Sequence, residues 1–144
     1  MSIIGIDPGK GGGIAWWDED SEAWEAQKMP DTVGDLVDLL RTLACHDGIR
    51  TAYVERVSSS PQMGVVSAFT FGRGLGNIEA ACQALGIALH WVSPAVWQKE
   101  MGCRTGGDKN VSKRRAQELF PTLKVTHAIA DALLIAEYGR RQDV

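Results

Sequence analysis

Three acidic residues stand where predicted strands or helices would present their side chains to a shared site. Asp7 follows the apolar run that opens the chain, Glu55 follows a second apolar run, and Asp131 lies near the start of the last predicted helix. A carboxylate directly after an apolar strand is costly unless something pairs with it. Because carboxylate oxygens are hard ligands, the three residues suit a divalent cation such as Mg²⁺ or Mn²⁺.

An imidazole accompanies the third carboxylate. His127 precedes Asp131 by four residues, so both side chains extend from one face of a helix toward the same region. Three carboxylates and one imidazole could hold two ions about 3.5 to 4 Å apart, a spacing used to activate water and stabilise the leaving oxygen in phosphodiester hydrolysis. The pattern is therefore compatible with a site for metal-dependent phosphodiester hydrolysis.

Each of these residues also has a simpler structural explanation. Asp7 could form an Asx turn within Asp-Pro-Gly, Glu55 could pair with Arg56 or Arg73, and His127 could be a polar residue at a helix N-terminus. Spacing alone leaves the metal site and these explanations equally open.

Hydrophobic patterning predicts the elements that would position the site. Five strands are expected at 2–7, 14–18, 22–29, 51–55 and 88–92, the first three as a meander. Apolar residues at helical spacing predict a helix over 33–43, with Thr32 and Asp35 set as a capping box.

Further helices are expected from Val66 to Leu85, after Pro94, over 112–120, and from His127 to 138, ending before Gly139. This order predicts an α/β fold with a five-stranded mixed sheet and helices on both faces.

Composition is that of one soluble globular domain spanning residues 1–144. Of the 144 residues, 44% are hydrophobic and 23% are charged, which is sufficient to bury a core. The sequence has no apolar run long enough for a membrane span and no signal-peptide pattern, so we expect a cytoplasmic protein. Cys45, Cys82 and Cys103 form no CxxC pair, and we expect reduced packing residues rather than a disulfide or zinc site.

Charge is distributed unevenly along the chain, although the formal net charge is only −3. Residues 1–50 carry ten acidic and four basic side chains, whereas residues 99–124 carry seven basic and three acidic ones. The basic segment could follow a phosphate backbone. A solvated helix face would produce the same clustering.

The segments GIDPGKGGGIA, YVE and HAIADALLIAEYG, in this order, resemble the RuvC family of Holliday junction resolvases, particularly the shorter bacteriophage versions. The resemblance spans nearly the whole chain and includes FGRGLG and SPAVWQK. It implies an RNase H-like fold and a crossover junction endodeoxyribonuclease that uses two Mg²⁺ or Mn²⁺ ions. It also implies a homodimer that resolves four-way DNA junctions by paired symmetric nicks, in a bacterial cell or phage-infected host.

The same resemblance implies that Asp7, Glu55 and Asp131 are catalytic metal ligands. Many family members place a fourth ligand, an Asp, three or four residues before the last of these, where this chain has His127 and Ala128. We therefore assign the fourth ligand to His127 and expect higher activity with Mn²⁺ than with Mg²⁺.

Candidate DNA contacts also follow from the resemblance. Gln62 and Met63 lie in the loop after Glu55, where related enzymes insert a side chain into the junction centre, although a surface loop without this role is the alternative. Phosphate contacts are expected from five basic residues, which would otherwise serve solubility: Arg73, Arg104, Lys109, Lys113 and Arg114.

Two residue patterns have competing interpretations. Gly72, Gly76 and Ala80 lie four apart in the long helix and could bring it close to a second copy of the chain or to its own sheet. The five tryptophans could stack on bases, but most fall on strands and are expected to pack against the sheet; Trp97, near the basic segment, is the least certain.

Three other functions compete with the resolvase interpretation. A YqgF-like RNA-processing nuclease would share the opening strand motif, and DPGKGGG suggests an ATP-binding phosphotransferase of the actin-like superfamily. Such phosphotransferases usually need two lobes and a longer chain. A catalytically silent DNA-binding module would result if His127 cannot complete the site.

Overall fold

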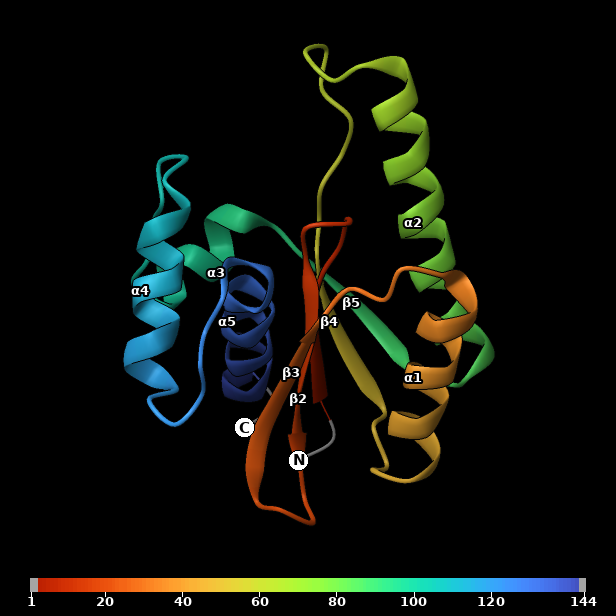
Figure 1. Cartoon of the computed structure of the whole chain (residues 1–144), viewed down its shortest axis with the longest axis vertical. Helices are drawn as coiled ribbons and strands as arrows, with labels where there is room; N and C mark the ends of the chain where they lie inside the picture. The colour runs from red at the N-terminus through yellow and green to blue at the C-terminus, as the bar shows by residue number, and fades with distance from the viewer. Residues whose placement is uncertain (1–2, 143–144) are drawn as a thin grey trace.

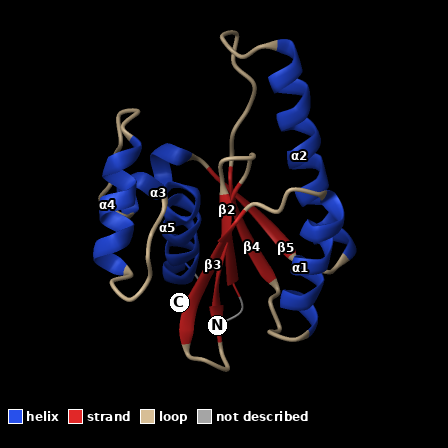
Figure 2. Ribbon diagram, viewed as in Figure 1, coloured by secondary structure: helices blue, strands red, loops and turns tan. Residues whose placement is uncertain are grey.

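The computed structural model describes residues 3–142, shown in Figures 1 and 2. Its elements in chain order are β1 (Ile3–Asp7), β2 (Gly13–Asp18), β3 (Ala23–Lys28), α1 (Val33–Cys45), β4 (Thr51–Glu55), α2 (Val65–Ala84), β5 (Ala88–Val92), α3 (Pro94–Glu100), α4 (Lys109–Leu119) and α5 (His127–Gln142). All the predicted strands and helices are present, with ends shifted by a few residues.

The strands form one mixed sheet in the order β3-β2-β1-β4-β5. β1, β2 and β3 make the predicted antiparallel meander, while β4 is parallel to both β1 and β5. Ile6 pairs with Val54 in the parallel register, so the next residues, Asp7 and Glu55, end adjacent strands at the same edge. The topology therefore brings together two side chains 48 positions apart in sequence.

Helices cover both faces of the sheet, as the sequence predicted. α1 and α2 lie on one face and α3, α4 and α5 on the other (Figure 1). The core under α1 and α2 includes Ile4, Ile14, Leu40 and Ile78. The core on the opposite face includes Ile3, Trp97, Leu133 and Ala136.

Helix α5 approaches the sheet unusually closely because glycines occupy the contact. A Cβ placed on Gly5 of β1 would lie 2.4 Å from the carbonyl oxygen of Ala132 and 2.4 Å from the amide nitrogen of Ala136. A Cβ on Gly13 of β2 would lie 2.6 Å from the carbonyl oxygen of Ala128. These are impossible separations, so only glycine permits this packing.

Helix α2 is packed only in part. Its N-terminal half extends beyond the sheet (Figure 1). The buried residues of α2 are Ile78, Ala81 and Cys82, all in its C-terminal half. Gly72, Gly76 and Ala80 are exposed, so the interpretation that they pack against the chain's own sheet is wrong.

Three other expectations need correction. α4 begins at Lys109 rather than Ser112, because the Asp108 side chain accepts a hydrogen bond from the Asn110 amide and caps it. α5 continues past Gly139 to Gln142, because Gly139 does not adopt the positive φ that would end the helix; its missing side chain instead leaves room for the ring of Tyr53. Cys82 and Cys103 are buried as expected, but Cys45 is exposed and does not pack.

Other expectations agree with the structure. The Thr32 side chain accepts a hydrogen bond from the Asp35 amide and caps α1. Ser2, predicted as part of the first strand, lies outside the described residues. Among residues 3–142, none of the helices combines the length and apolar character needed to cross a membrane.

Candidate functional site

Asp7, Glu55 and Asp131 come together where β1 and β4 end and α5 begins. The three side chains are partly buried and electrostatically coupled, since the charge of Asp131 raises the pKa of both Asp7 and Glu55. The close packing of α5 on Gly5 and Gly13 places Asp131 beside the sheet edge. The structure thus assembles the three carboxylates that the sequence singled out.

Asp7 experiences the strongest perturbation. Burial, followed by the charges of Asp131 and Glu55, raises its pKa from 3.8 to about 8, while Lys109 acts in the opposite direction. Gly12 lies against it, because a Cβ there would meet the Asp7 carbonyl oxygen and would lie 3.1 Å from the Asp7 carboxyl carbon. A carboxyl group held in such surroundings favours either a proton or a cation.

Glu55 is held by a hydrogen bond rather than by an arginine. The indole nitrogen of Trp97 donates to Glu55 Oε2 at 2.9 Å. Burial raises the pKa of Glu55, the Trp97 hydrogen bond lowers it, and Asp131 raises it. Within residues 3–142 neither Arg56 nor Arg73 forms an ion pair with Glu55, so those predicted alternatives are wrong.

The Oδ1 atom of Asp131 is buried and has no hydrogen-bond partner among the described residues. Burial raises the pKa of Asp131, and the nearby Ser112 hydroxyl and the charges of Lys109 and His127 lower it; the Ser112 hydroxyl itself donates to the Lys109 carbonyl oxygen at 3.2 Å. His127 is exposed at the start of α5, one turn before Asp131, as the spacing predicted. An unpaired buried carboxylate oxygen is a costly feature that a bound cation would satisfy.

The donor set fits divalent cations, although the side chains are not drawn tightly together. Asp7, Glu55, His127 and Asp131 do not include three ligand atoms that all lie within 4.8 Å of one another. Two ions roughly 4 Å apart distribute their ligands over a wider space than one ion does. Together with the unpartnered Asp131 oxygen, these oxygen and nitrogen donors are compatible with such a pair.

In the described part of the chain, a different group of acidic residues lies closer together. Asp18, Asp20 and Asp47 have ligand atoms within 4.8 Å of one another. Asp18 ends β2, which is antiparallel to β1, so this group lies at the opposite edge of the sheet from Asp7. Asp20 is exposed and its amide donates to Asp18, an arrangement that turns adopt without any ion.

The predicted DNA contacts divide between two regions. Lys109 lies at the start of α4, and its charge lowers the pKa of all three site carboxylates. Arg104, Lys113 and Arg114 lie on α4 or the loop before it and form no ion pair with the residues that the structure describes. Gln62 is exposed in the loop between β4 and α2.

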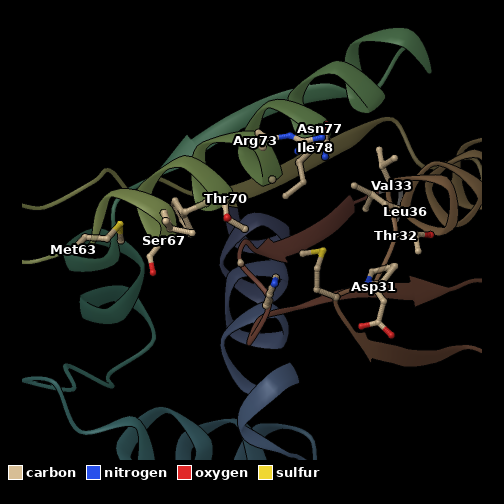
Figure 3. Close-up of a pocket in the computed structure, with 17 residues that line it drawn as sticks. Asp31, Thr32, Val33, Leu36, Met63, Ser67, Thr70, Arg73, Asn77 and Ile78 are labelled. Carbon is tan, nitrogen blue, oxygen red and sulfur yellow. The ribbon is translucent and has the colours of Figure 1, made fainter.

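Met63 and Arg73 line a groove of about 840 Å³ between α2 and the loops at 9–10 and 29–33. Figure 3 shows Met63, Ser67, Thr70 and Arg73 on the α2 side of the groove, opposite Asp31 and Thr32. Gly9 and Lys10, which also line it, belong to the turn that follows Asp7. One side of the groove is therefore formed by residues that directly follow the site residue Asp7 in the chain.

The tryptophans follow the packing interpretation. Trp16, Trp17, Trp24 and Trp91 are half-buried on strands, and Trp97 is fully buried, which leaves it unable to stack on a base.

Sequence reasoning missed the hydrogen bond between Trp97 and Glu55, the buried hydroxyl of Ser112 near Asp131, and the position of Lys109 among the carboxylates. A signal for Ser112 was present, since it lies four residues before Ala116 on the buried face of a helix with many charged residues.

Comparison with known proteins shows similarity in fold. The chain superimposes on the Thermus thermophilus RuvC structure with a TM-score of 0.67 and 19% identity, covering 99% of this chain and 97% of that one. It superimposes on T. thermophilus RuvC in complex with a Holliday junction substrate with a TM-score of 0.66 and 20% identity, covering 98% and 96%. No family model and no curated protein matches the sequence. The RNase H-like fold predicted for the chain is confirmed.

Proposed function

We propose that the chain is a divalent-metal-dependent, structure-selective DNA endonuclease that resolves Holliday junctions and related branched DNA by paired symmetric nicks. The observation that carries the proposal is the meeting of three partly buried carboxylates at one sheet edge, one of them with a buried, unpartnered oxygen. The fold of this chain is that of RuvC over nearly its full length, and one solved RuvC structure contains a Holliday junction substrate.

Asp7, Glu55 and Asp131 are the proposed metal ligands, and His127 is the proposed fourth. When bound, two Mg²⁺ or Mn²⁺ ions would supply the Lewis acidity that activates water and neutralises the departing 3′-oxygen. The four protein ligands hold and orient this centre. The position of the His127 imidazole, one turn before Asp131 on the same helix, supports its assignment, since both side chains extend toward the same region.

Lys109 has a proposed double role. It is exposed, yet its charge reaches all three carboxylates, so it can meet a phosphate that enters the site. Arg104 in the loop before α4 and Lys113 and Arg114 on α4 are the other proposed phosphate contacts, which would set the register of the DNA. Gln62, Met63 and Arg73 are proposed to contact the junction from the loop and first turns of α2.

We further propose that the enzyme is a homodimer, because paired symmetric nicks require two active sites. An apolar ridge on the projecting half of α2, formed by Val65, Val66 and Phe69, is 87%, 79% and 68% exposed. Gly72 and Gly76 continue the line of Val65 and Phe69 along one helix face. Highly exposed apolar side chains that lie close together on one helix are typical of an association surface.

Two alternatives are weighed by specific observations. An RNA-processing nuclease would use the same carboxylates, so substrate comparison must distinguish it. An actin-like phosphotransferase has less support, since the five-stranded sheet and its helices superimpose on RuvC over nearly the full length of both chains. The proposed place of action is the cytoplasm of a bacterial cell or phage-infected host, in a bacteriophage-type branch of the RuvC family.

The test is a cleavage assay with synthetic four-way junctions, forks, flaps and structured RNA, in MgCl₂ and in MnCl₂. We expect paired nicks in opposing junction strands, with faster turnover in MnCl₂ because imidazole accepts Mn²⁺ more readily. Asp7→Asn and Asp131→Asn should reduce cleavage at least about a thousandfold while retaining junction binding in a gel shift.

Several outcomes would contradict parts of this proposal. Normal cleavage by both Asn variants would refute the catalytic assignment, and preferred cleavage of RNA would favour the RNA-processing function. Equal or greater turnover in MgCl₂ would count against His127 as a ligand. Junction binding without nicking in either metal would indicate a catalytically silent DNA-binding module.

A further inference from the structure

Trp97 is fully buried, yet its only polar atom contacts a carboxylate of the candidate site. It lies on α3, is 0% exposed, and donates from Nε1 to Glu55 Oε2 at 2.9 Å. An indole N–H is a donor only, so it can act neither as a metal ligand nor as a base. Its contribution to the site must therefore be made through Glu55.

Core packing makes Trp97 a rigid support. Its ring belongs to a buried cluster with Val92, Met101 and Cys103. Val92 is paired with Glu55 in the parallel register of β4 and β5, and α3 begins two residues later. The indole and the carboxylate are thus fixed to the same part of the sheet.

The free Glu55 side chain would not hold this position by itself. Glutamate has several rotatable bonds, so a Glu55 side chain without a partner could place its carboxylate in several orientations. A charge-assisted hydrogen bond stabilises the ionised form and restricts its rotation. It occupies about one of four lone-pair positions, so the others remain available to a cation.

We propose that Trp97 is a positioning residue that holds the Glu55 carboxylate in the orientation needed to bind a divalent cation. This inference depends on the proposed function, in which Glu55 is a metal ligand. Removing a hydrogen-bond partner that orients a ligand typically weakens metal affinity by about 10- to 100-fold. We therefore expect Trp97→Phe, which lacks the donor but keeps an aromatic ring, to raise the Kd for Mn²⁺ by about tenfold or more.

The test is a calorimetric titration of MnCl₂ into the full chain without DNA. Trp97→Phe is compared with the wild type and with Trp91→Phe, a matched control on β5 that packs in the other core cluster. Trp91→Phe should bind Mn²⁺ like the wild type. At saturating MnCl₂, junction cleavage by Trp97→Phe should recover toward the wild-type rate, because the ligands themselves are intact.

A double-mutant cycle with Glu55→Gln tests whether Trp97 acts through Glu55. The expected result is non-additivity: Trp97→Phe should weaken Mn²⁺ binding in the wild type but cause little further loss in Glu55→Gln. Additive losses, or an unchanged Kd in Trp97→Phe, would overturn the inference alone. An unchanged Kd in Glu55→Gln would instead refute Glu55 as a ligand and with it that part of the proposed function.

A second measurement covers the case in which Trp97→Phe does not fold. In wild-type protein labelled with ¹⁵N-tryptophan, MgCl₂ should move one indole N–H resonance, and Glu55→Gln should displace the same resonance. The indole signals of Trp16, Trp17, Trp24 and Trp91 should stay in place. If neither change moves any indole signal, Trp97 does not sense Glu55 and the inference is wrong.

Discussion

At the level of a single residue, the carboxylate of Asp7 lowers the stability of the metal-free folded state. Its raised pKa, about 8, has burial as the first cause and the repulsion of Asp131 and Glu55 as the next ones. All three causes penalise the charged form, and a bound cation would relieve each of them. The residue is therefore better suited to binding a metal than to stabilising the chain.

The first prediction concerns the stability of the metal-free chain. The pKa of Asp7 is higher in the folded state than its unfolded value of 3.8, so the folded state retains a proton that the unfolded state loses. Stability should fall as pH rises from about 4 to about 8. At pH 8 in EDTA, Asp7→Asn should increase the free energy of unfolding by on the order of 2 kcal/mol, measured by urea denaturation.

Two controls accompany this measurement. At pH 4 the gain should disappear, and the exposed Asp31→Asn should show no comparable gain at pH 8. MnCl₂ should stabilise the wild type far more than Asp7→Asn, since a ligand that binds only the folded state adds its binding free energy. A loss of stability in Asp7→Asn at pH 8 without metal would contradict the electrostatic description of the site.

At the level of elements, the contact between α5 and the sheet positions Asp131. Gly5 and Gly13 remove side chains from the sheet surface, so the backbone of α5 lies directly against β1 and β2. Alanines on the facing side of the helix, among them Ala132 and Ala136, are fully buried. The depth of Asp131 in the site depends on this spacing.

The second prediction is that Gly5→Ala strongly destabilises the chain. Its Cβ would lie 2.4 Å from backbone atoms of α5, which cannot move aside as a flexible side chain can. Overpacking at such a contact costs about 3 kcal/mol, measured as a loss in the free energy of unfolding. Gly11→Ala is the matched control, because nothing lies within 4 Å of its Cβ and its φ is not positive. Similar stability of the two variants would show that α5 is not held at this distance.

At the level of the whole molecule, none of residues 3–142 covers the apolar ridge on α2. Val65, Val66 and Phe69 are exposed on the part of α2 that extends beyond the sheet (Figure 1). Leaving these side chains in water forgoes about 1.5 to 3 kcal/mol for each that a partner could bury. In the proposed homodimer, a second copy of the chain would bury them and supply the second active site.

The third prediction is that Phe69→Lys converts a dimer into a monomer. Phe69 is 68% exposed, so the substitution should leave folding intact while placing a charge in the proposed interface. Sedimentation velocity should show loss of the dimer, and junction cleavage should change from paired to single nicks. Val96→Lys, at a 50% exposed position on α3, is the control and should remain dimeric. A monomeric wild type, or a dimeric Phe69→Lys, would refute this interface.

The sequence by itself determined the strands and helices and indicated which three carboxylates would lie at their ends. An apolar run followed by the turn residues Pro8 and Gly9 indicated where β1 ends, which placed Asp7 at a strand terminus. The four-residue spacing of His127 and Asp131 was enough to place both on one face of α5. These features are local, because they depend on backbone geometry within a few residues.

Only the tertiary structure decided what surrounds those carboxylates. The hydrogen bond from Trp97 to Glu55 joins residues 42 positions apart, and its formation depends on the parallel pairing of β4 with β5. The raised pKa of Asp7 arises from burial and from charges brought close by the fold. The exposure of the apolar ridge on α2 depends on how far that helix extends past the sheet, because the same residues could have packed in a core.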